Sequence, residues 1–274
     1  MSFTKAPRDT RLTYVFDLDG VIYRGTEPQP HAQEVVQSLR ESGHFVRFFT
    51  NNAAMSRDDY VTKLTAMGIP VSLDEIMTSS YATGLYFAER GAIGKTVYRI
   101  GEDGMARELT AAGMHVICAD EEPDAKIDFV VVGLDRDFNY RKLARAMRAI
   151  RDGAEFIATN RDATFPVESG DLLPGGGSLV AALVTAVGRE PVLIGKPETY
   201  AMQKVLDQTG ARPDQTIVVG DRLDTDIEAG NRIGAWTVLV LTGVTSREQA
   251  EAAAGTLHRC QTRRRRGNRA ASGC

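Results

Sequence analysis

Two aspartates separated by one residue, Asp17 and Asp19, follow an apolar segment and precede Gly20. If the apolar segment is a strand, residues i and i+2 point to the same side, so the two carboxylates converge. Converging carboxylates repel each other, and they usually share a proton or hold a cation. The same pattern also suits an ordinary turn, because Asp and Gly are common after strands. The pair alone leaves both interpretations open.

Two further segments place polar groups directly after apolar residues. Thr50 and Asn51 follow such a run, and a helix is expected to begin near Ser56. A hydroxyl and backbone N–H groups at this point can bind a phosphate. Lys196 follows the run 192–194, where its ammonium can neutralise phosphate oxygens. The alternatives are a turn with a helix cap in the first case and an exposed charge in the second.

A fourth segment is acidic, because Asp221, Asp224 and Asp226 follow the apolar run 216–219. Mg²⁺ in proteins usually binds one or two carboxylates together with waters and substrate phosphate. Asp226 also fits the first turn of a helix, where an acid complements the helix dipole, and Asp224 fits a plain loop. Together the four segments supply a nucleophile, an acid/base, phosphate ligands and Mg²⁺ ligands. That inventory suits phosphoryl transfer through an aspartyl-phosphate.

The elements that must position these side chains alternate along the chain, as in an α/β protein. Several apolar runs are rich in Val, Ile and Phe without polar alternation, which is typical of parallel strands covered on both faces. In such sheets ligands bind at the carboxyl ends of the strands. We predict strands at 12–16, 45–49, 96–100, 127–132, 155–158, 192–194, 216–219 and 236–241. We predict helices at 31–42, 56–67, 79–90, 103–112, 140–151, 178–187, 198–209 and 226–233.

On these residues the chain resembles a known family, the phosphatases of the haloacid dehalogenase (HAD) superfamily. The closer resemblance is to subfamily IIA, the branch of NagD-like nucleotide phosphatases, para-nitrophenyl phosphatases, pyridoxal phosphatase and phosphoglycolate phosphatase. It covers about residues 12–245. The motifs that carry it are Asp17-Leu18-Asp19-Gly20-Val21-Ile22-Tyr23, Thr50-Asn51-Asn52, Thr159-Asn160-Arg161-Asp162, Pro174-Gly175-Gly176-Gly177-Ser178, Gly195-Lys196-Pro197 and Gly220-Asp221-Arg222-Leu223-Asp224-Thr225-Asp226.

The resemblance implies a phosphoric monoester hydrolase that works through a covalent aspartyl-phosphate. Its nucleophile would be Asp17, and its general acid/base would be Asp19, which protonates the leaving alkoxide and later deprotonates water. The phosphoryl group would be held by Thr50, Asn51 and Lys196.

The resemblance also implies Mg²⁺ as the cofactor. Its ligands would be Asp17, the backbone carbonyl of Asp19, and Asp221, with Asp226 as a supporting acid. The substrate would be a small phosphorylated metabolite. Phosphoglycolate, pyridoxal phosphate, sugar phosphates and nucleoside monophosphates all fit these motifs.

Thr50 and Lys196 are separated by 145 residues, more than a helix–strand connection needs. The resemblance implies a Rossmann-like, doubly wound parallel-sheet core formed by 1–79 and 186–258. The intervening 80–185 would form an inserted α/β cap domain, which excludes water and contacts the substrate.

Three residues of the cap are candidates for substrate specificity: Asn160, Arg161 and Asp162. The family places this loop near the leaving group, and the alternative is a surface turn. Caps of this family often mediate dimers, so a homodimer is one expected oligomeric state.

Composition and charge exclude other classes of protein. No apolar run is long enough to cross a membrane and 1–11 does not form a secretory signal, so we expect a cytoplasmic protein without a membrane partner. The chain has 33 basic and 36 acidic residues. Six arginines and no acid lie in 259–274, which leaves 1–258 with a net charge of −9. An acidic body argues against nucleic acid as a partner. We expect the basic tail, 259–274, to be disordered.

The main alternative function is a non-catalytic phosphometabolite-binding or scaffold protein of the same fold. Such a protein would bind the same ligands without turnover. The presence of all four of Asp17, Asp19, Lys196 and Asp221 argues against it.

Overall fold

A computed structural model describes residues 11–118, 126–166, 172–253 and 260–262. The first of its two large sheets has six strands in the order β15-β14-β13-β1-β4-β5. All of its pairings are parallel. The strands are β1 (Thr13–Phe16), β4 (Phe45–Thr50), β5 (Ile76–Thr78), β13 (Thr216–Gly220), β14 (Trp236–Leu239) and β15 (Cys260–Thr262).

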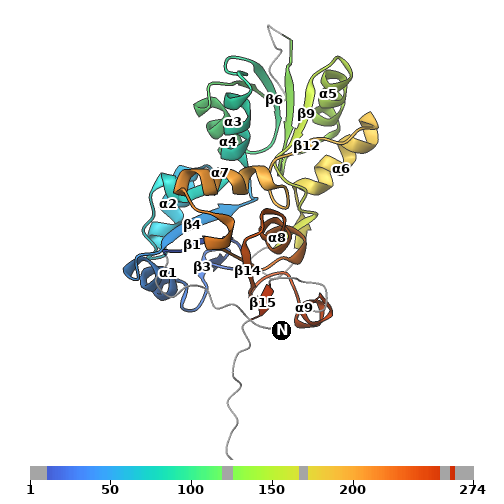
Figure 1. Cartoon of the computed structure of the whole chain (residues 1–274). Helices are drawn as coiled ribbons and strands as arrows, with labels where there is room; N and C mark the ends of the chain where they lie inside the picture. Colours follow the sequence, from blue (N-terminus) through green and yellow to red (C-terminus); the bar gives the residue numbers. More distant parts are fainter. Residues whose placement is uncertain (1–10, 119–125, 167–171, 254–259, 263–274) are drawn as a thin grey trace, which may run out of the picture.

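Helices cover both faces of this sheet (Figure 1). Successive strand residues point to opposite faces, so Phe16 and Phe48 pack in a different apolar cluster from their neighbours Val15 and Phe49. One face packs against α1 (Ala32–Glu41) and α2 (Arg57–Ala66), and the other against α7 (Thr199–Thr209) and α8 (Glu228–Ile233). The core is therefore doubly wound, as the sequence predicts.

The second sheet is formed by residues that lie between β5 and β13 in sequence. Its order is β12-β9-β8-β6-β7, and all of its pairings are parallel. α3 and α4 cover one face and α5 and α6 the other (Figure 1). The elements are α3 (Ser79–Glu89), β6 (Thr96–Ile100), α4 (Asp103–Ala111), β7 (His115–Ile117), β8 (Phe129–Val132), α5 (Tyr140–Arg151), β9 (Glu155–Ala158), α6 (Gly176–Val187) and β12 (Val192–Leu193).

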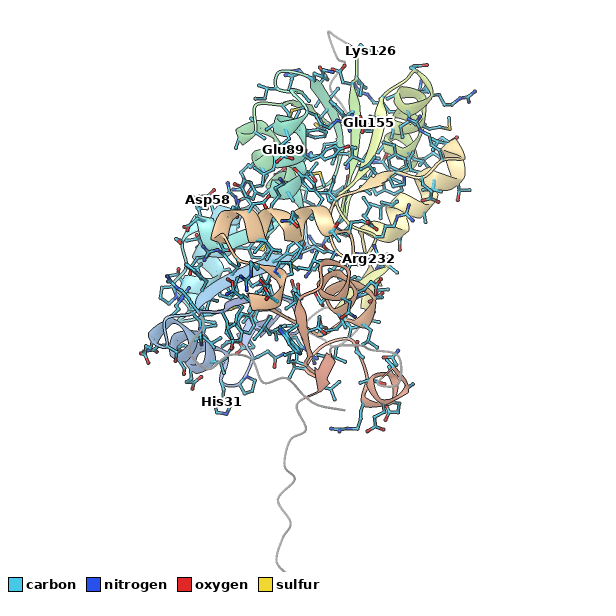
Figure 2. All side chains as sticks on the ribbon, viewed as in Figure 1. His31, Asp58, Glu89, Lys126, Glu155 and Arg232 are labelled. Atoms are coloured by element: carbon cyan, nitrogen blue, oxygen red, sulfur yellow. The ribbon has the colours of Figure 1, made fainter. Side chains whose placement is uncertain are left out.

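The two sheets share one apolar cluster, which runs from β1 and β13 through α7 to α3, α4 and β8. Polar contacts reinforce this junction. Glu89 lies at the end of α3 (Figure 2). It accepts hydrogen bonds from Tyr200 and Lys204 of α7. On α4, the buried Glu108 accepts from the backbone N–H of Arg57 at 2.6 Å. The second sheet and its helices therefore pack directly on the first.

Smaller elements complete the described part of the chain. Two antiparallel hairpins pair β2 (Tyr23–Arg24) with β3 (Glu27–Pro28), and β10 (Thr164–Pro166) with β11 (Leu172–Pro174). Short helical segments lie at Leu73–Glu75, Pro213–Gln215, Leu223–Ile227 and α9 (Arg247–Ala253). No helix among the described residues is both long enough and apolar enough to span a bilayer.

Two predictions differ from the structure. The predicted strand at 192–194 is shorter and pairs with β9 in the second sheet, although we placed 186–258 with the core. The expected disorder at 259–274 does not hold for Cys260–Thr262, which pair in parallel with β14. Such pairing needs only the backbone groups of an open sheet edge and no apolar side chains. The rest of that tail lies outside the described residues.

Candidate active site

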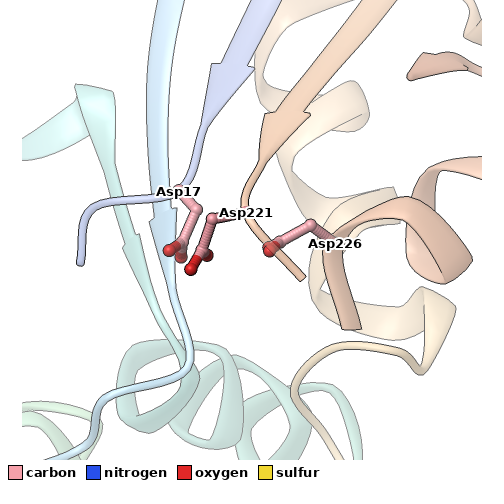
Figure 3. A group of neighbouring side chains, drawn as sticks. All are labelled: Asp17, Asp221 and Asp226. Atoms are coloured by element: carbon pink, nitrogen blue, oxygen red, sulfur yellow. The ribbon is translucent and has the colours of Figure 1, made fainter. Parts of the chain in front are cut away.

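The carboxyl ends of β1, β4 and β13 meet at one edge of the first sheet, and the predicted side chains lie there. The backbone N–H of Asp17 still donates to the β13 residue Val219 at 2.9 Å, which fixes the chain where β1 ends. One carboxylate oxygen from each of Asp17, Asp221 and Asp226 lies within 4.8 Å of the others. Figure 3 shows Asp17 and Asp221 side by side and Asp226 pointing toward them from the following turn. The structure thus brings together acids that are more than 200 residues apart in sequence.

Lys196 provides the positive charge among these acids. Its ammonium donates to Asp17 Oδ1 at 2.6 Å, to Asp226 Oδ1 at 2.7 Å and to the carbonyl oxygen of Phe49 at 2.9 Å. The Lys196 side chain is only 3% exposed. Burial acts to lower its pKa, but the two carboxylates outweigh burial and raise the pKa above its usual value. Lys196 therefore stays protonated.

Lys196 pairs with Asp17 and Asp226, whereas Asp221 lies beside them and accepts from the backbone N–H of Val244. Burial raises the pKa of Asp17 well above its usual value, although Lys196 opposes the shift. Burial, followed by the nearby charge of Asp226, raises the pKa of Asp221 to about 6. Buried charges of one sign call for a counter-ion. Carboxylate oxygens at this separation match the ligands that Mg²⁺ prefers, so the donor set fits a divalent cation.

Two glycines make the close approach around Asp221 possible. Gly20 adopts a φ of +82°, and a Cβ added to it would lie 2.8 Å from Asp221 Oδ2. A Cβ on Gly243 would lie 1.8 Å from the same oxygen, which accepts a hydrogen bond from the backbone N–H of Val244 at 2.6 Å. A side chain at either position would displace the carboxylate, so both glycines are required by the geometry of the site.

Thr50 and Asn51 lie at the end of β4, beside Lys196, as predicted. The hydroxyl oxygen of Thr50 accepts from the backbone N–H of Asn52 at 3.0 Å. The Asn51 side chain, however, is used to hold Lys196. Its Oδ1 accepts from Lys196 N at 2.8 Å, and its Nδ2 donates to Lys196 O at 2.9 Å. The role predicted for Asn51 in holding the phosphoryl group stays a prediction, and with the side chain bound to Lys196 it is the backbone N–H that would fill it.

We expect Asn51→Ala to lower the free energy of unfolding by about 2–4 kcal/mol, because it leaves two buried backbone groups of Lys196 unsatisfied. It should also reduce kcat by about tenfold or more, since Lys196 loses its fixed position. Urea unfolding and turnover of 4-nitrophenyl phosphate measure the two effects. Asn139→Ala, which removes the N-cap of α5 at a cost of about 1 kcal/mol, is the control and should keep its kcat. Equal kcat in all three proteins would contradict this role.

The three specificity candidates occupy different surroundings. Asn160 is buried and donates to the carbonyl oxygen of Asn51 at 2.8 Å. Asp162 lines the same cavity as Asp17 and accepts from Asn51 Nδ2 at 3.2 Å. Arg161 is not among the residues of that cavity; it pairs with Glu190 and lines a second hollow next to it. Of the three, only Asp162 and Asn160 face the space above Asp17.

Sequence reasoning missed several residues that line this cavity. They are Leu134 after β8, Thr164 and Phe165 of the hairpin, and Arg222 of the acidic segment. Gly176, at the start of α6, also lines the cavity and lies in the glycine motif quoted above. Arg222 lies between two acids of the acidic motif, so the sequence could have identified it as a candidate site residue. The hairpin residues belong to no motif, and their place over the cavity depends on how the second sheet packs.

Comparisons with known proteins identify the family of the chain. The model of the haloacid dehalogenase-like hydrolase family matches residues 14–115, and a HAD-hydrolase-like model matches residues 193–260. A 5'-nucleotidase of Bacillus subtilis is 40% identical over 235 residues, which cover 86% of this chain and 89% of that protein.

Solved structures agree as well. A p-nitrophenyl phosphatase from Archaeoglobus fulgidus is 39% identical with a TM-score of 0.81, over 88% of this chain and 90% of that one. A glycerol phosphate phosphatase from Mycobacterium tuberculosis, in complex with magnesium, is 37% identical with a TM-score of 0.80, over 91% and 74% of the two chains.

The doubly wound parallel sheet and the acidic site at its carboxyl edge define a hydrolase with a Rossmann-like core. The chain belongs to the haloacid dehalogenase-like hydrolases. Within that family it falls in subfamily IIA, as its sequence motifs predict.

Proposed function

We propose that this protein is a Mg²⁺-dependent phosphatase that hydrolyses small phosphate monoesters through a covalent aspartyl-phosphate on Asp17. The observation that carries the proposal is the position of the Lys196 ammonium, which contacts both Asp17 and Asp226 beside Asp221. A buried carboxylate next to a fixed ammonium and further acids is the arrangement that phosphoryl transfer to an aspartate requires.

The carboxylates of Asp17 and Asp221, together with the backbone carbonyl of Asp19, would hold Mg²⁺, with Asp226 in support. When bound, the ion would withdraw negative charge from the phosphoryl oxygens and so reduce their repulsion of the Asp17 carboxylate. The Lys196 ammonium, which contacts Asp17 Oδ1, would contribute in the same direction. Thr50 and neighbouring backbone N–H groups would orient the phosphoryl group.

The chain's own residues would then carry the reaction in two steps. A carboxylate oxygen of Asp17 attacks phosphorus while the bond from phosphorus to the ester oxygen breaks. Asp19 gives its proton to that leaving oxygen. In the second step Asp19 takes a proton from water, the water oxygen attacks phosphorus, and the bond to Asp17 breaks. Inorganic phosphate leaves, and both carboxyl groups return to their starting state.

The second sheet would act as the cap that supplies the leaving-group side of the site. Leu134, which follows β8, and the hairpin residues Thr164 and Phe165 line the cavity above Asp17, and they would exclude water and contact the organic part of the substrate. Groups that bind only phosphoryl and Mg²⁺ cannot distinguish leaving groups. The relatives are named for different substrates, so phosphoglycolate, pyridoxal phosphate, sugar phosphates and nucleoside monophosphates should all be compared. A cytoplasmic location and a homodimer stay predictions.

We expect hydrolysis of 4-nitrophenyl phosphate to fall by about 100-fold or more when divalent cations are removed with EDTA, and to return when Mg²⁺ is added. The release of 4-nitrophenolate measures the rate. Because EDTA also removes other divalent ions, separate additions of Mg²⁺ and Ca²⁺ test which ion supports turnover. Full activity in EDTA would contradict the Mg²⁺ dependence. Binding of phosphate monoesters without any turnover in Mg²⁺ would favour the non-catalytic alternative.

A further inference from the structure

Tyr23 lies against the Asp19 carboxylate because the chain turns back on itself after β1. The backbone N–H of Gly20 donates to Tyr23 O at 2.8 Å, and the N–H of Tyr23 donates to Leu18 O at 3.2 Å. This tight turn directs the Tyr23 side chain back toward Asp19. Its hydroxyl donates to Asp19 Oδ2 at 3.2 Å.

The Tyr23 ring is held in place from several sides. It is 1% exposed and packs in the apolar cluster with Phe48 and Leu64. The Lys63 ammonium, from α2, lies 3.6 Å from the ring centroid. Burial, followed by the charge of Asp19, raises the pKa of the Tyr23 hydroxyl well above its usual value. Tyr23 therefore stays protonated and serves Asp19 only as a donor.

We propose that Tyr23 is a positioning residue for Asp19, whose hydroxyl holds Oδ2 and leaves Oδ1 as the oxygen that exchanges the proton with the leaving group. The proposal rests on the acid/base role proposed for Asp19. Because Oδ2 accepts the tyrosine hydrogen bond, the proton of neutral Asp19 is favoured on Oδ1. The side-chain rotation that would exchange the two oxygens is opposed by the same bond.

The hydrogen bond should also become stronger during the reaction. As the Asp19 Oδ1–H bond breaks and the leaving oxygen gains the proton, the carboxyl group becomes a carboxylate. Hydrogen bonds to charged acceptors are stronger than those to neutral ones. An interaction that is stronger in the transition state than in the ground state accelerates the step. The benefit should be largest for leaving groups that need the proton most.

Aryl phosphates of nearly equal shape test whether the effect of Tyr23 depends on the basicity of the leaving group. 4-Nitrophenolate is a stable anion that leaves with little protonation, whereas phenolate and 4-methoxyphenolate are more basic. For Tyr23→Phe we expect kcat/KM to fall about 10- to 100-fold with phenyl and 4-methoxyphenyl phosphate. With 4-nitrophenyl phosphate it should change by less than about threefold. The parameter kcat/KM is used because it reports the steps up to departure of the leaving group and not the later hydrolysis of the aspartyl-phosphate.

Two further variants separate positioning from a structural role. Tyr98→Phe is the matched control, because Tyr98 is also fully buried and its hydroxyl makes one hydrogen bond, to Lys142 O at 3.5 Å in the second sheet's core. It should leave all three substrates unchanged. Asp19→Asn should show the same dependence on leaving group as Tyr23→Phe, with a larger loss. Adding Tyr23→Phe to Asp19→Asn should then have little further effect, since the acid that it positions is already absent.

These experiments distinguish an error in the role of Tyr23 from an error in the proposed function itself. If the unaltered protein hydrolyses these esters and Asp19→Asn shows the leaving-group dependence, the proposed function stands. In that case the role of Tyr23 would be overturned by either of two results for Tyr23→Phe: an equal loss on all three substrates, or no loss on any of them. Full additivity of the two substitutions in the double variant would overturn it as well. Thermal unfolding of each variant shows whether the fold is retained.

Discussion

Asp17→Asn is expected to abolish turnover of phosphate monoesters while the protein keeps its fold. An amide cannot form the aspartyl-phosphate, so kcat should fall by about 10⁴-fold or more. The amide has the shape of the carboxyl group, and its oxygen can still accept the Lys196 hydrogen bond. Lys196 also keeps its contacts with Asp226 and with the carbonyl oxygen of Phe49. The buried ammonium is therefore not left without a partner, and thermal unfolding should change little.

The control for this variant is an acid in the segment that follows β13. Asp224 lies in the acidic segment, but its side chain is 70% exposed and pairs with Arg222, so Asp224→Asn should keep most of the activity. Rapid acid quenching with a labelled substrate should trap phosphate on the unaltered chain and not on Asp17→Asn. Recovery of the label on a peptide without residue 17 would show that the nucleophile is another residue.

The main elements of the fold were predictable because they carry long apolar runs. β8, Phe129–Val132, is buried at every position, and its sequence predicts a parallel strand covered on both faces. Strands of two or three residues carry little pattern of their own. β5 and β7 were not predicted, and β12 was assigned to the core although it pairs with β9. Their pairing depends on tertiary packing that no local pattern reports.

The meeting of the acids Asp17 and Asp221 was predictable for a topological reason. Residues that follow parallel strands reach the same edge of the sheet, so Asp17 and Asp221 had to lie near each other once β1 and β13 were neighbours. The position of Lys196 has a different origin. It follows β12 of the second sheet, and it reaches Asp17 because the Asn51 amide binds its backbone.

Side-chain partners within the loops were not predictable. Asn51 and Lys196 are 145 positions apart, and nothing in either segment shows that an amide of one bonds to the backbone of the other. Arg161 and Asp162 are adjacent in sequence, yet the first pairs with Glu190 and the second lines the cavity of Asp17. Motifs identify which segments meet, but the direction of each side chain is decided by contacts with distant residues.

Lys196→Met is expected to damage both stability and catalysis. Removing one partner from a buried ion pair leaves the remaining charge uncompensated, which typically costs about 3–5 kcal/mol. Here Asp17 and Asp226 would both lose the ammonium that separates them. The loss of a charge that stabilises the transferred phosphoryl group should lower kcat by about 10²- to 10³-fold. Urea unfolding in EDTA measures the first effect, and turnover of 4-nitrophenyl phosphate in Mg²⁺ measures the second.

Lys142→Met separates the two effects, because Lys142 forms another mostly buried ion pair, with Asp135 at 2.7 Å, whose residues are absent from the cavity of Asp17. That variant should lose stability and keep its kcat. Mg²⁺ should stabilise both variants, since each keeps the carboxylates that would bind it and a ligand that binds only the folded state stabilises that state. The gain should be larger for Lys196→Met, whose carboxylates have lost the ammonium. The rate of Lys196→Met should stay low at any Mg²⁺ concentration, because a bound ion would not replace the hydrogen bonds and charge that the ammonium offers the phosphoryl group. If Lys196→Met has normal stability in EDTA, the lysine is not required to stabilise the three carboxylates in the folded protein. If it has a normal rate in Mg²⁺, Lys196 has no part in the proposed mechanism.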